Sequence, residues 1–268
     1  MKTEFPLPDD GSELNRLLAP GLAPVDIPPD RRAGLRAQLL ARVAASAAAH
    51  AGLLTVRAGD GRWQAVKSGV RAKSLWQGPE GNSVLIELAP GAALPVHRHQ
   101  WLEEGIVLEG DLQLGNLALR TGDYQASPPD SRHDRITSRG GALAYLRGTS
   151  LGHAGRVLKE IVGGWLPRAG DPPLTVFGRA EGWAPLSSGV ECRVLRRDGL
   201  RCSRFLRFAP GASLPGHGHV QDEENMLIEG EVFFGDVLVR AGEFHLAPAG
   251  SRHGPITTDT GALLFVRG

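Results

Sequence analysis

The sequence repeats itself at a constant offset of 120 residues, and this repeat limits the fold more than any other feature. Trp63 corresponds to Trp183 and Gly148 to Gly268, with no insertion or deletion between these positions. Two segments that share one pattern of residues adopt the same fold. A period of this length is too long for a solenoid and fits a small domain. The chain is therefore predicted to contain two tandem domains of one architecture.

Length and composition agree with this division. The chain has 268 residues, 41% of them hydrophobic, so two domains of about 100 residues can each bury a core. We predict an N-terminal extension over residues 1–55, a first domain over 56–155 and a second over 156–268. Thirty basic and 29 acidic side chains nearly balance, and no dense basic cluster is present, so direct nucleic-acid binding is not expected.

Short apolar runs alternate with turns rich in glycine, proline and acidic residues in each repeat. In the first repeat these runs cover residues 83–88, 105–108, 112–119 and 142–146, and the second repeat has their equivalents. Several short strands at this spacing are typical of an all-β barrel or sandwich. The predicted fold class is all-β, with a short α-helical N-terminal extension.

The helix of the extension is predicted over Arg31 to His50. Leu35, Leu39 and Val43 recur at four-residue spacing and form one apolar stripe, and Asp30 is the expected N-cap. The stripe fits packing on the first barrel, a dimer contact or contact with a partner protein. The first residues lack the apolar run of a signal peptide, and no apolar stretch is long enough to span a bilayer. A cytoplasmic protein without membrane contact is therefore expected.

Each repeat carries three histidines and one glutamate in the same order. Because residues i and i+2 of a strand face the same side, the two histidines of His-x-His can turn both imidazoles into one barrel. Imidazole and carboxylate donors without thiolate suit a divalent metal, and we expect one per domain, zinc or iron first, with manganese or nickel as alternatives. The predicted ligands are His97, His99, Glu103 and His133 in the first repeat and His217, His219, Glu223 and His253 in the second.

The spacing of these ligands resembles a known family. The pattern Gly-x5-His-x-His-x3-Glu-x6-Gly begins at Gly91 and again at Gly211, and it is similar to the first cupin motif. The second cupin motif, which contains Pro-x-Gly-x2-His, matches Pro248, Gly250 and His253, whereas Asp130 stands at the glycine position in the first repeat. Asp tolerates left-handed backbone geometry, so this turn is expected to survive. The resemblance implies two cupin barrels of the jelly-roll type.

Within the cupins, the chain resembles the ChrR-like group, in which a cupin follows the sigma-binding module of a zinc-dependent anti-sigma factor. This resemblance implies a metal-dependent sensor or regulator. A small ligand or oxidant would then act at the metal, and a sigma factor or another protein would bind the N-terminal helix. Cys192 is the first cysteine of the sequence, so the His-x3-Cys-x2-Cys zinc motif of those proteins has no counterpart before it.

Two further hypotheses stay open. Other members of the group resemble iron-dependent dioxygenases that cleave carbon–carbon bonds in diketones or aromatic ketones, for which the metal must keep open positions. A sugar isomerase or epimerase would need an acid and a base beside the metal. The candidates for those roles are Glu104, Tyr124, Glu224 and His245.

Overall fold

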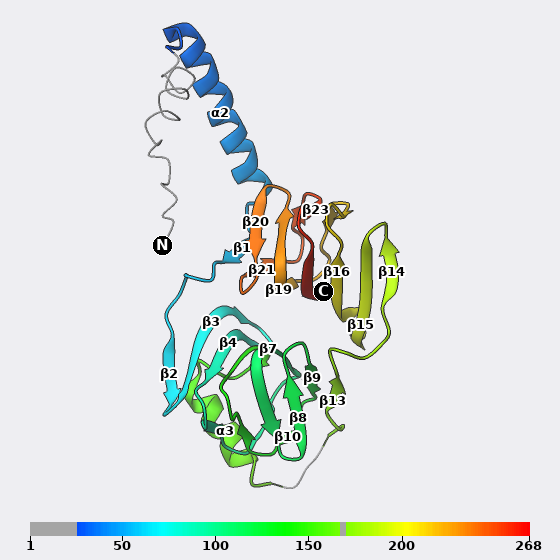
Figure 1. Ribbon diagram of the computed structural model, residues 1–268. Helices are drawn as coiled ribbons and strands as arrows, with labels where there is room; N and C mark the ends of the chain where they lie inside the picture. Colours follow the sequence, from blue (N-terminus) through cyan, green and yellow to red (C-terminus); the bar gives the residue numbers. More distant parts are fainter. Residues whose placement is uncertain (1–25, 167–169) are drawn as a thin grey trace, which may run out of the picture. The chain divides into compact units, whose positions relative to one another are not determined.

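The computed structural model describes residues 26–166 and 170–268 (Figure 1). The chain divides into two compact units, one that ends at residue 48 and one that spans residues 49–268. The second unit contains both repeats. None of the described helices is long and apolar enough to cross a membrane.

Helix α2 (Pro29–Ala49) is the helix predicted for the extension, but it begins two residues earlier than expected. Proline suits the first helical position because it has no N–H to leave unpaired there. Asp30 therefore lies in the first turn, where its charge opposes the helix dipole, and is not the N-cap that the sequence suggested. None of the 21 residues of α2 is buried.

Each barrel contains a ten-stranded antiparallel sheet, nine strands of which come from its own repeat, and a separate two-stranded ladder. The elements of the first repeat are β2 (Gln64–Lys67), β3 (Val70–Gly78), β4 (Gly81–Leu88), β5 (Ala93–Leu94), β6 (His97–Arg98), β7 (Glu103–Leu114), β8 (Leu117–Arg120), β9 (Tyr124–Ser127), β10 (Arg132–His133), β11 (Ile136–Thr137) and β12 (Ala142–Thr149). Those of the second are β14 (Ala184–Ser187), β15 (Val190–Asp198), β16 (Arg201–Phe208), β17 (Ser213–Leu214), β18 (His217–Gly218), β19 (Glu223–Phe234), β20 (Val237–Arg240), β21 (Phe244–Ala247), β22 (Arg252–His253), β23 (Ile256–Thr257) and β24 (Ala262–Arg267). The predicted all-β architecture of two tandem barrels is confirmed.

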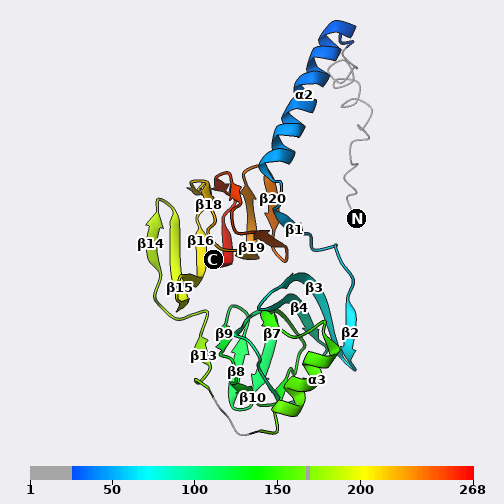
Figure 2. The same ribbon diagram turned by 180° about the vertical axis from the view of Figure 1, so that it is seen from behind.

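The two barrels exchange one edge strand each. Strand β1 (Leu54–Val56) precedes the first repeat but pairs with β21 of the second barrel, and β13 (Leu174–Val176) precedes the second repeat but pairs with β9 of the first. Both exchanged strands can be followed from opposite sides in Figures 1 and 2. The boundaries at residues 55 and 155 stay a prediction, and the exchange shows that each sheet takes a strand from outside its own repeat.

A shared apolar core joins the two barrels. It contains Tyr124, Tyr145, Phe205, Phe244 and Phe265, which come from both repeats and are almost completely buried. Phe265 contacts three of these rings, with centroids 5.8 to 6.3 Å apart. Aromatic rings bury large areas and favour such tilted contacts, so this cluster holds the barrels in one compact unit.

One helix of the second unit was not predicted. Helix α3 (Ala154–Gly163) follows β12, at the predicted boundary between the two domains. It packs against β6, the strand that begins with His97. The helix thus lies next to the predicted ligands of the first repeat.

Candidate metal centres

Short antiparallel ladders bring the predicted ligands of each repeat together. In the first barrel β6 pairs with β10, so His97 lies opposite His133. In the second barrel β18 pairs with β22, and His217 lies opposite His253. The turn before the last histidine needs left-handed backbone. Asp130 has φ 66° and its counterpart Gly250 has φ 83°, which confirms the expectation for this turn.

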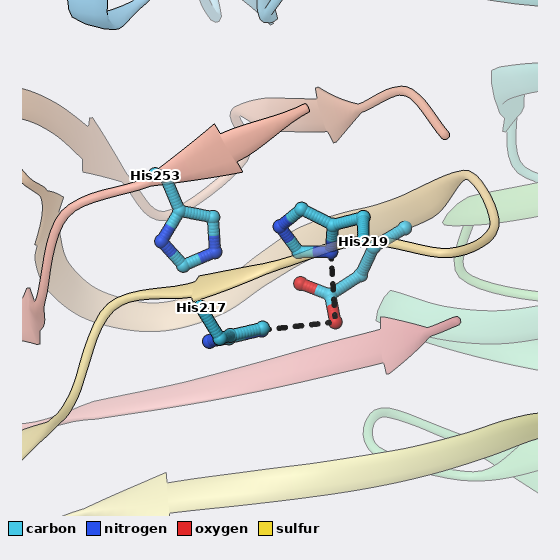
Figure 3. A group of neighbouring side chains, drawn as sticks. His217, His219 and His253 are labelled. Carbon is cyan, nitrogen blue, oxygen red and sulfur yellow. Dashed lines mark ion pairs between the residues drawn. The ribbon is translucent and has the colours of Figure 1, made fainter. Parts of the chain in front are cut away.

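The second centre brings all four predicted ligands into one cluster. One donor atom from each of His217, His219, Glu223 and His253 lies within 4.8 Å of the others. Glu223 Oε2 is 3.7 Å from His217 Nε2 and 3.9 Å from His219 Nδ1. Figure 3 shows the three imidazoles gathered around the same space. This arrangement can surround a single cation.

Unpaired nitrogens in the second centre test whether a metal fits it. The Nε2 atoms of His219 and His253 are buried and have no hydrogen-bond partner among the described residues. The Nδ1 atom of His253 lies 2.7 Å from the carbonyl oxygen of Gly254, to which it can donate. Metal-binding histidines commonly donate one ring N–H to such an acceptor, which turns the other nitrogen toward the metal. The residues present therefore fit a divalent metal.

Electrostatics favour the metal-binding protonation state at three of these four groups, whereas the hydrogen bond with Glu223 raises the pKa of His217. Burial raises the pKa of the Glu223 carboxyl, but the hydrogen bond from His217 and the charges of His219 and Arg204 outweigh it and bring the pKa to about 2. Burial lowers the pKa of both His219 and His253. A charged carboxylate and neutral imidazoles are the protonation states that a metal requires.

The first centre has a different geometry. Donor atoms of His97, His99 and Glu103 lie within 4.8 Å of one another, and His133 is not part of this cluster. The His133 ring is next to the cluster, with its centroid 4.7 Å from that of His99, but its Nε2 lies 3.0 Å from Ser127 Oγ. The role of His133 as a ligand stays a prediction. The buried His99 Nε2 has no hydrogen-bond partner among the described residues, so this cluster also fits a metal.

A cavity of about 400 Å³ adjoins the first centre. His97, Glu103 and His133 form part of its wall. Most of the remaining wall is aliphatic and comes from strands of the first barrel, among them Ile86, Leu88, Leu112, Leu114, Ala144 and Leu146. The first barrel therefore combines a candidate metal site with an apolar chamber.

Larger side chains occupy the corresponding positions of the second barrel. Phe234 replaces Leu114, and Leu264 replaces Ala144. Both are fully buried. The Phe234 ring stacks on His245 with centroids 4.3 Å apart and meets His253 edge-on at 5.2 Å. The second centre is thus packed by core residues.

Helix α3 contributes residues to the cavity that the sequence reasoning missed. Val157, Glu160 and Ile161 line it, and Glu160 is 9% exposed. Burial raises the pKa of the Glu160 carboxyl, and the hydrogen bond from Ser150 opposes this shift. In the sequence, Val157 and Ile161 are four residues apart, which places them on one face of a helix together with Glu160. This spacing could have identified the helix and the face that lines the cavity.

Three of the four acid and base candidates lie between the barrels, and the fourth, His245, lies beside the second centre. Tyr124 donates a 2.6 Å hydrogen bond to Glu104, and Arg267 Nη1 of the other barrel lies 2.9 Å from the same carboxylate. By the repeat symmetry, Glu224 accepts a 3.0 Å hydrogen bond from Arg147 of the first barrel. Each of these two carboxylates therefore forms an ion pair with an arginine of the other barrel. The fourth candidate, His245, is a core residue whose Nδ1 lies 2.9 Å from Thr55 Oγ1.

Solved structures share this fold at low sequence identity. A candidate dioxygenase from Nostoc punctiforme is 16% identical, with a TM-score of 0.60 over 80% of this chain and 81% of that one. Protein Ylba from E. coli is 14% identical, with a TM-score of 0.60 over 81% and 90%. A mutant oxalate decarboxylase from Bacillus subtilis is 18% identical, with a TM-score of 0.56 over 80% and 76%.

A search of curated protein sequences gives no significant match. The family model of the ChrR cupin-like domain, in contrast, matches residues 51–150 and again 173–268. These two ranges contain both predicted ligand sets and both exchanged strands. The chain belongs to the ChrR cupin-like family and is a tandem bicupin.

Proposed function

We propose that this bicupin is a metal-dependent dioxygenase whose reaction takes place in the first barrel. The observation that carries the proposal is the aliphatic cavity of about 400 Å³ that reaches His97 and Glu103. Ligand pockets in proteins have volumes of about 300–1,000 Å³ and combine apolar walls with a few polar groups. The first barrel has both features at a candidate metal site.

The donor set of the first centre supports oxygen chemistry. Two imidazoles and one carboxylate, from His97, His99 and Glu103, form the tight cluster. Such a set leaves coordination positions open, and non-haem iron oxygenases use it. A divalent iron ion bound there would supply the activation of oxygen. The three side chains would hold that ion, and His133, whose Nε2 lies 3.0 Å from Ser127 Oγ, lies beside them.

The cavity walls select the substrate and exclude water. Most of the lining is aliphatic, although Lys67 is also part of it, so the chamber favours a ligand with apolar groups, such as a small ketone or diketone. Glu103 is buried at this end of the chamber, and burial raises its pKa. The substrate would be oriented by contact with side chains such as Leu112 and Leu146.

The second centre is proposed to hold a metal in a structural role. Four clustered ligands are typical of closed sites that stabilise a fold, whereas catalytic sites keep a position open. Phe234 and Leu264 fill the space that would otherwise receive a substrate. Metal at this centre would therefore contribute to folding stability.

Oxygen uptake tests the proposal. Protein purified without chelators is analysed for its metals, loaded with Fe²⁺ under nitrogen and mixed with small diketones in an oxygen electrode. We expect uptake that is lost in His97→Ala/His99→Ala and in Ala144→Leu, which installs the larger residue of the second barrel. Lys159→Gln, an exposed change on α3, is the matched control. Absence of uptake with every diketone, while the first centre is loaded with iron, would contradict the dioxygenase.

The second candidate is a metal-dependent regulator of the ChrR type. It is favoured by a different observation, the apolar stripe of α2, in which Leu39 and Val43 are 60% and 57% exposed. A partner such as a sigma factor would bind this stripe, and a small ligand or oxidant would act at the metal. Two zinc ions per chain, no oxygen uptake and loss of sigma-factor binding in Leu39→Asp would favour this candidate.

A further inference from the structure

Helix α3 is held directly against the first metal centre. A Cβ atom on Gly164, just after the helix, would lie 2.8 Å from the carbonyl oxygen of Val96 and 3.0 Å from Cα of His97. Only glycine permits this approach. At the other end of the helix, the Arg156 guanidinium lies 4.9 Å from the centroid of the Trp101 ring. Both ends of α3 therefore contact the segment that carries the ligands.

Hydrogen bonds connect the same segment to the middle of the helix. The Gln100 side chain donates to the backbone oxygen of Arg156 at 3.3 Å, and the Gln100 backbone N–H donates to Glu160 Oε1 at 3.4 Å. Gln100 lies between the ligands His99 and Glu103, so the position of Glu160 is fixed relative to them. Val220 takes the place of Gln100 in the second repeat and is 90% exposed.

Glu160 is a buried carboxyl group in the wall of an apolar chamber. Its Oε1 atom accepts the 2.7 Å hydrogen bond from Ser150 and the longer one from Gln100. No hydrogen bond to Oε2 comes from the residues that the structure describes. A buried acceptor of this kind costs free energy unless a partner reaches it. Glu103 and His97 both act on the pKa of Glu160, so this acceptor lies near the metal centre.

We infer that Glu160 is a specificity residue of the first barrel, and that it selects uncharged aliphatic ligands with a hydroxyl group beside a carbonyl group. The two ligand oxygens would bind the metal, the hydroxyl would donate to Glu160 Oε2, and the alkyl groups would fill the aliphatic chamber. This inference rests on the proposed function, because it takes the first centre as the place where the substrate binds its metal.

Size and charge narrow the ligand class. A cavity of about 400 Å³ lies within the size range of protein pockets that bind small molecules. A hydroxyketone carries no charge, and its alkyl groups suit the mostly aliphatic wall of the chamber. A site that accepts a hydrogen bond from a hydroxyl discriminates strongly against the analogue that lacks it, because the buried acceptor is then left unpaired.

Two probes of one carbon skeleton test the inference. These are 5-hydroxy-4-octanone and 4,5-octanedione, which both offer two adjacent oxygens and differ in the hydroxyl donor. Their affinities for the full-length, zinc-loaded protein are measured by calorimetry, since zinc binds the same donors without redox turnover. The proteins are wild type, Glu160→Gln, Glu160→Asp and the exposed control Lys159→Gln.

We expect the wild type and Lys159→Gln to prefer the hydroxyketone by about tenfold or more. Glu160→Gln should reduce this preference about tenfold, because its amide group can donate to the dione, whereas Glu160→Asp keeps a carboxylate and should keep the direction of the preference. If both probes bind and their ratio is the same in all four proteins, the inference is wrong while the proposed function stands. If neither probe binds the zinc-loaded wild type, both fail.

Discussion

Ser127 Oγ lies 3.0 Å from Nε2 of His133, so the last histidine of the first centre has a partner inside the protein. The corresponding residue of the second repeat is Ala247, and there His253 Nε2 has no hydrogen-bond partner among the described residues. The hydroxyl group of Ser127 is thus a difference between two centres that have the same residues at their ligand positions.

Exchanging these two residues should change the metal affinities in opposite directions. Ser127→Ala releases His133 Nε2 from a hydrogen bond with a net value of about 1 kcal/mol, so zinc should bind the first centre about fivefold more tightly. Ala247→Ser should weaken the second centre by a similar factor. Competition titrations with a fluorescent chelator measure both constants. If Ser127→Ala leaves the zinc affinity of the first centre unchanged, and Ala247→Ser leaves that of the second unchanged, the hydroxyl group does not affect metal binding through the last histidine.

Removal of the second metal should reduce stability more than removal of the first. The variant His217→Ala/His219→Ala is expected to lose one metal equivalent and several degrees of Tm, because four clustered ligands link metal binding to folding. The matched variant His97→Ala/His99→Ala should also lose one equivalent, with a smaller change in Tm. Mass spectrometry of metals and calorimetry provide the two readouts. The reverse order of Tm changes would argue against a structural role for the second centre.

Acid should destabilise the metal-free protein partly through His245. Burial lowers the pKa of this histidine to about 3, whereas an unfolded histidine has a pKa of about 6.5. The unfolded chain therefore binds the proton more readily, and the free energy of unfolding falls as the pH drops from about 6.5 toward 3. At about pH 5 the loss from this group amounts to about 2 kcal/mol.

The first barrel supplies the control for this effect, since Gln125 is the counterpart of His245. His245→Gln should make the free energy of unfolding less dependent on pH below about 6.5, whatever its effect on stability at neutral pH. Urea unfolding at several pH values measures this slope. An unchanged slope would mean that His245 is not protonated on unfolding in this range.

Arg147 is expected to be essential for the interface between the barrels. Its side chain and the Glu224 carboxylate are both almost fully buried, with Nε and Oε1 3.0 Å apart. Arg147→Met leaves that carboxylate buried without its cation, which should cost about 3–5 kcal/mol of unfolding free energy. Arg71 and Glu87 form an exposed pair at 2.7 Å, and Arg71→Met should cost less than about 1 kcal/mol. Similar losses in both variants would contradict this difference.

The proximity of most candidate ligands could be predicted because strand alternation and turn chemistry are local, although His133 lies outside the first cluster. His97 and His99 share a face for any strand of that register, and the turn at Asp130 depends only on its own backbone. The cavity was not predicted, although the difference between Ala144 and Leu264 is visible in the sequence. Whether such a difference leaves space depends on how neighbouring side chains pack, which a single sequence does not contain.

The strand exchange also could not be predicted from the sequence. Strands β1 and β13 both read Leu-Thr-Val, so each would fit either sheet equally well by its side chains. Helix α3 was missed because it lies outside the segments that the two repeats share. Comparison of the two repeats identifies the elements that they share, whereas the strand exchange and helix α3 depend on how the repeats are connected.

The exchanged strands also determine how the chain can be divided. A cut in the connection between the barrels would give one fragment that carries β1 without its partner β21 and another that carries β13 without its partner β9. Each fragment would expose an unpaired sheet edge, a surface on which other strands can add. The two halves are thus complementary fragments, and each would need the other, or a second copy of itself, to complete its sheet.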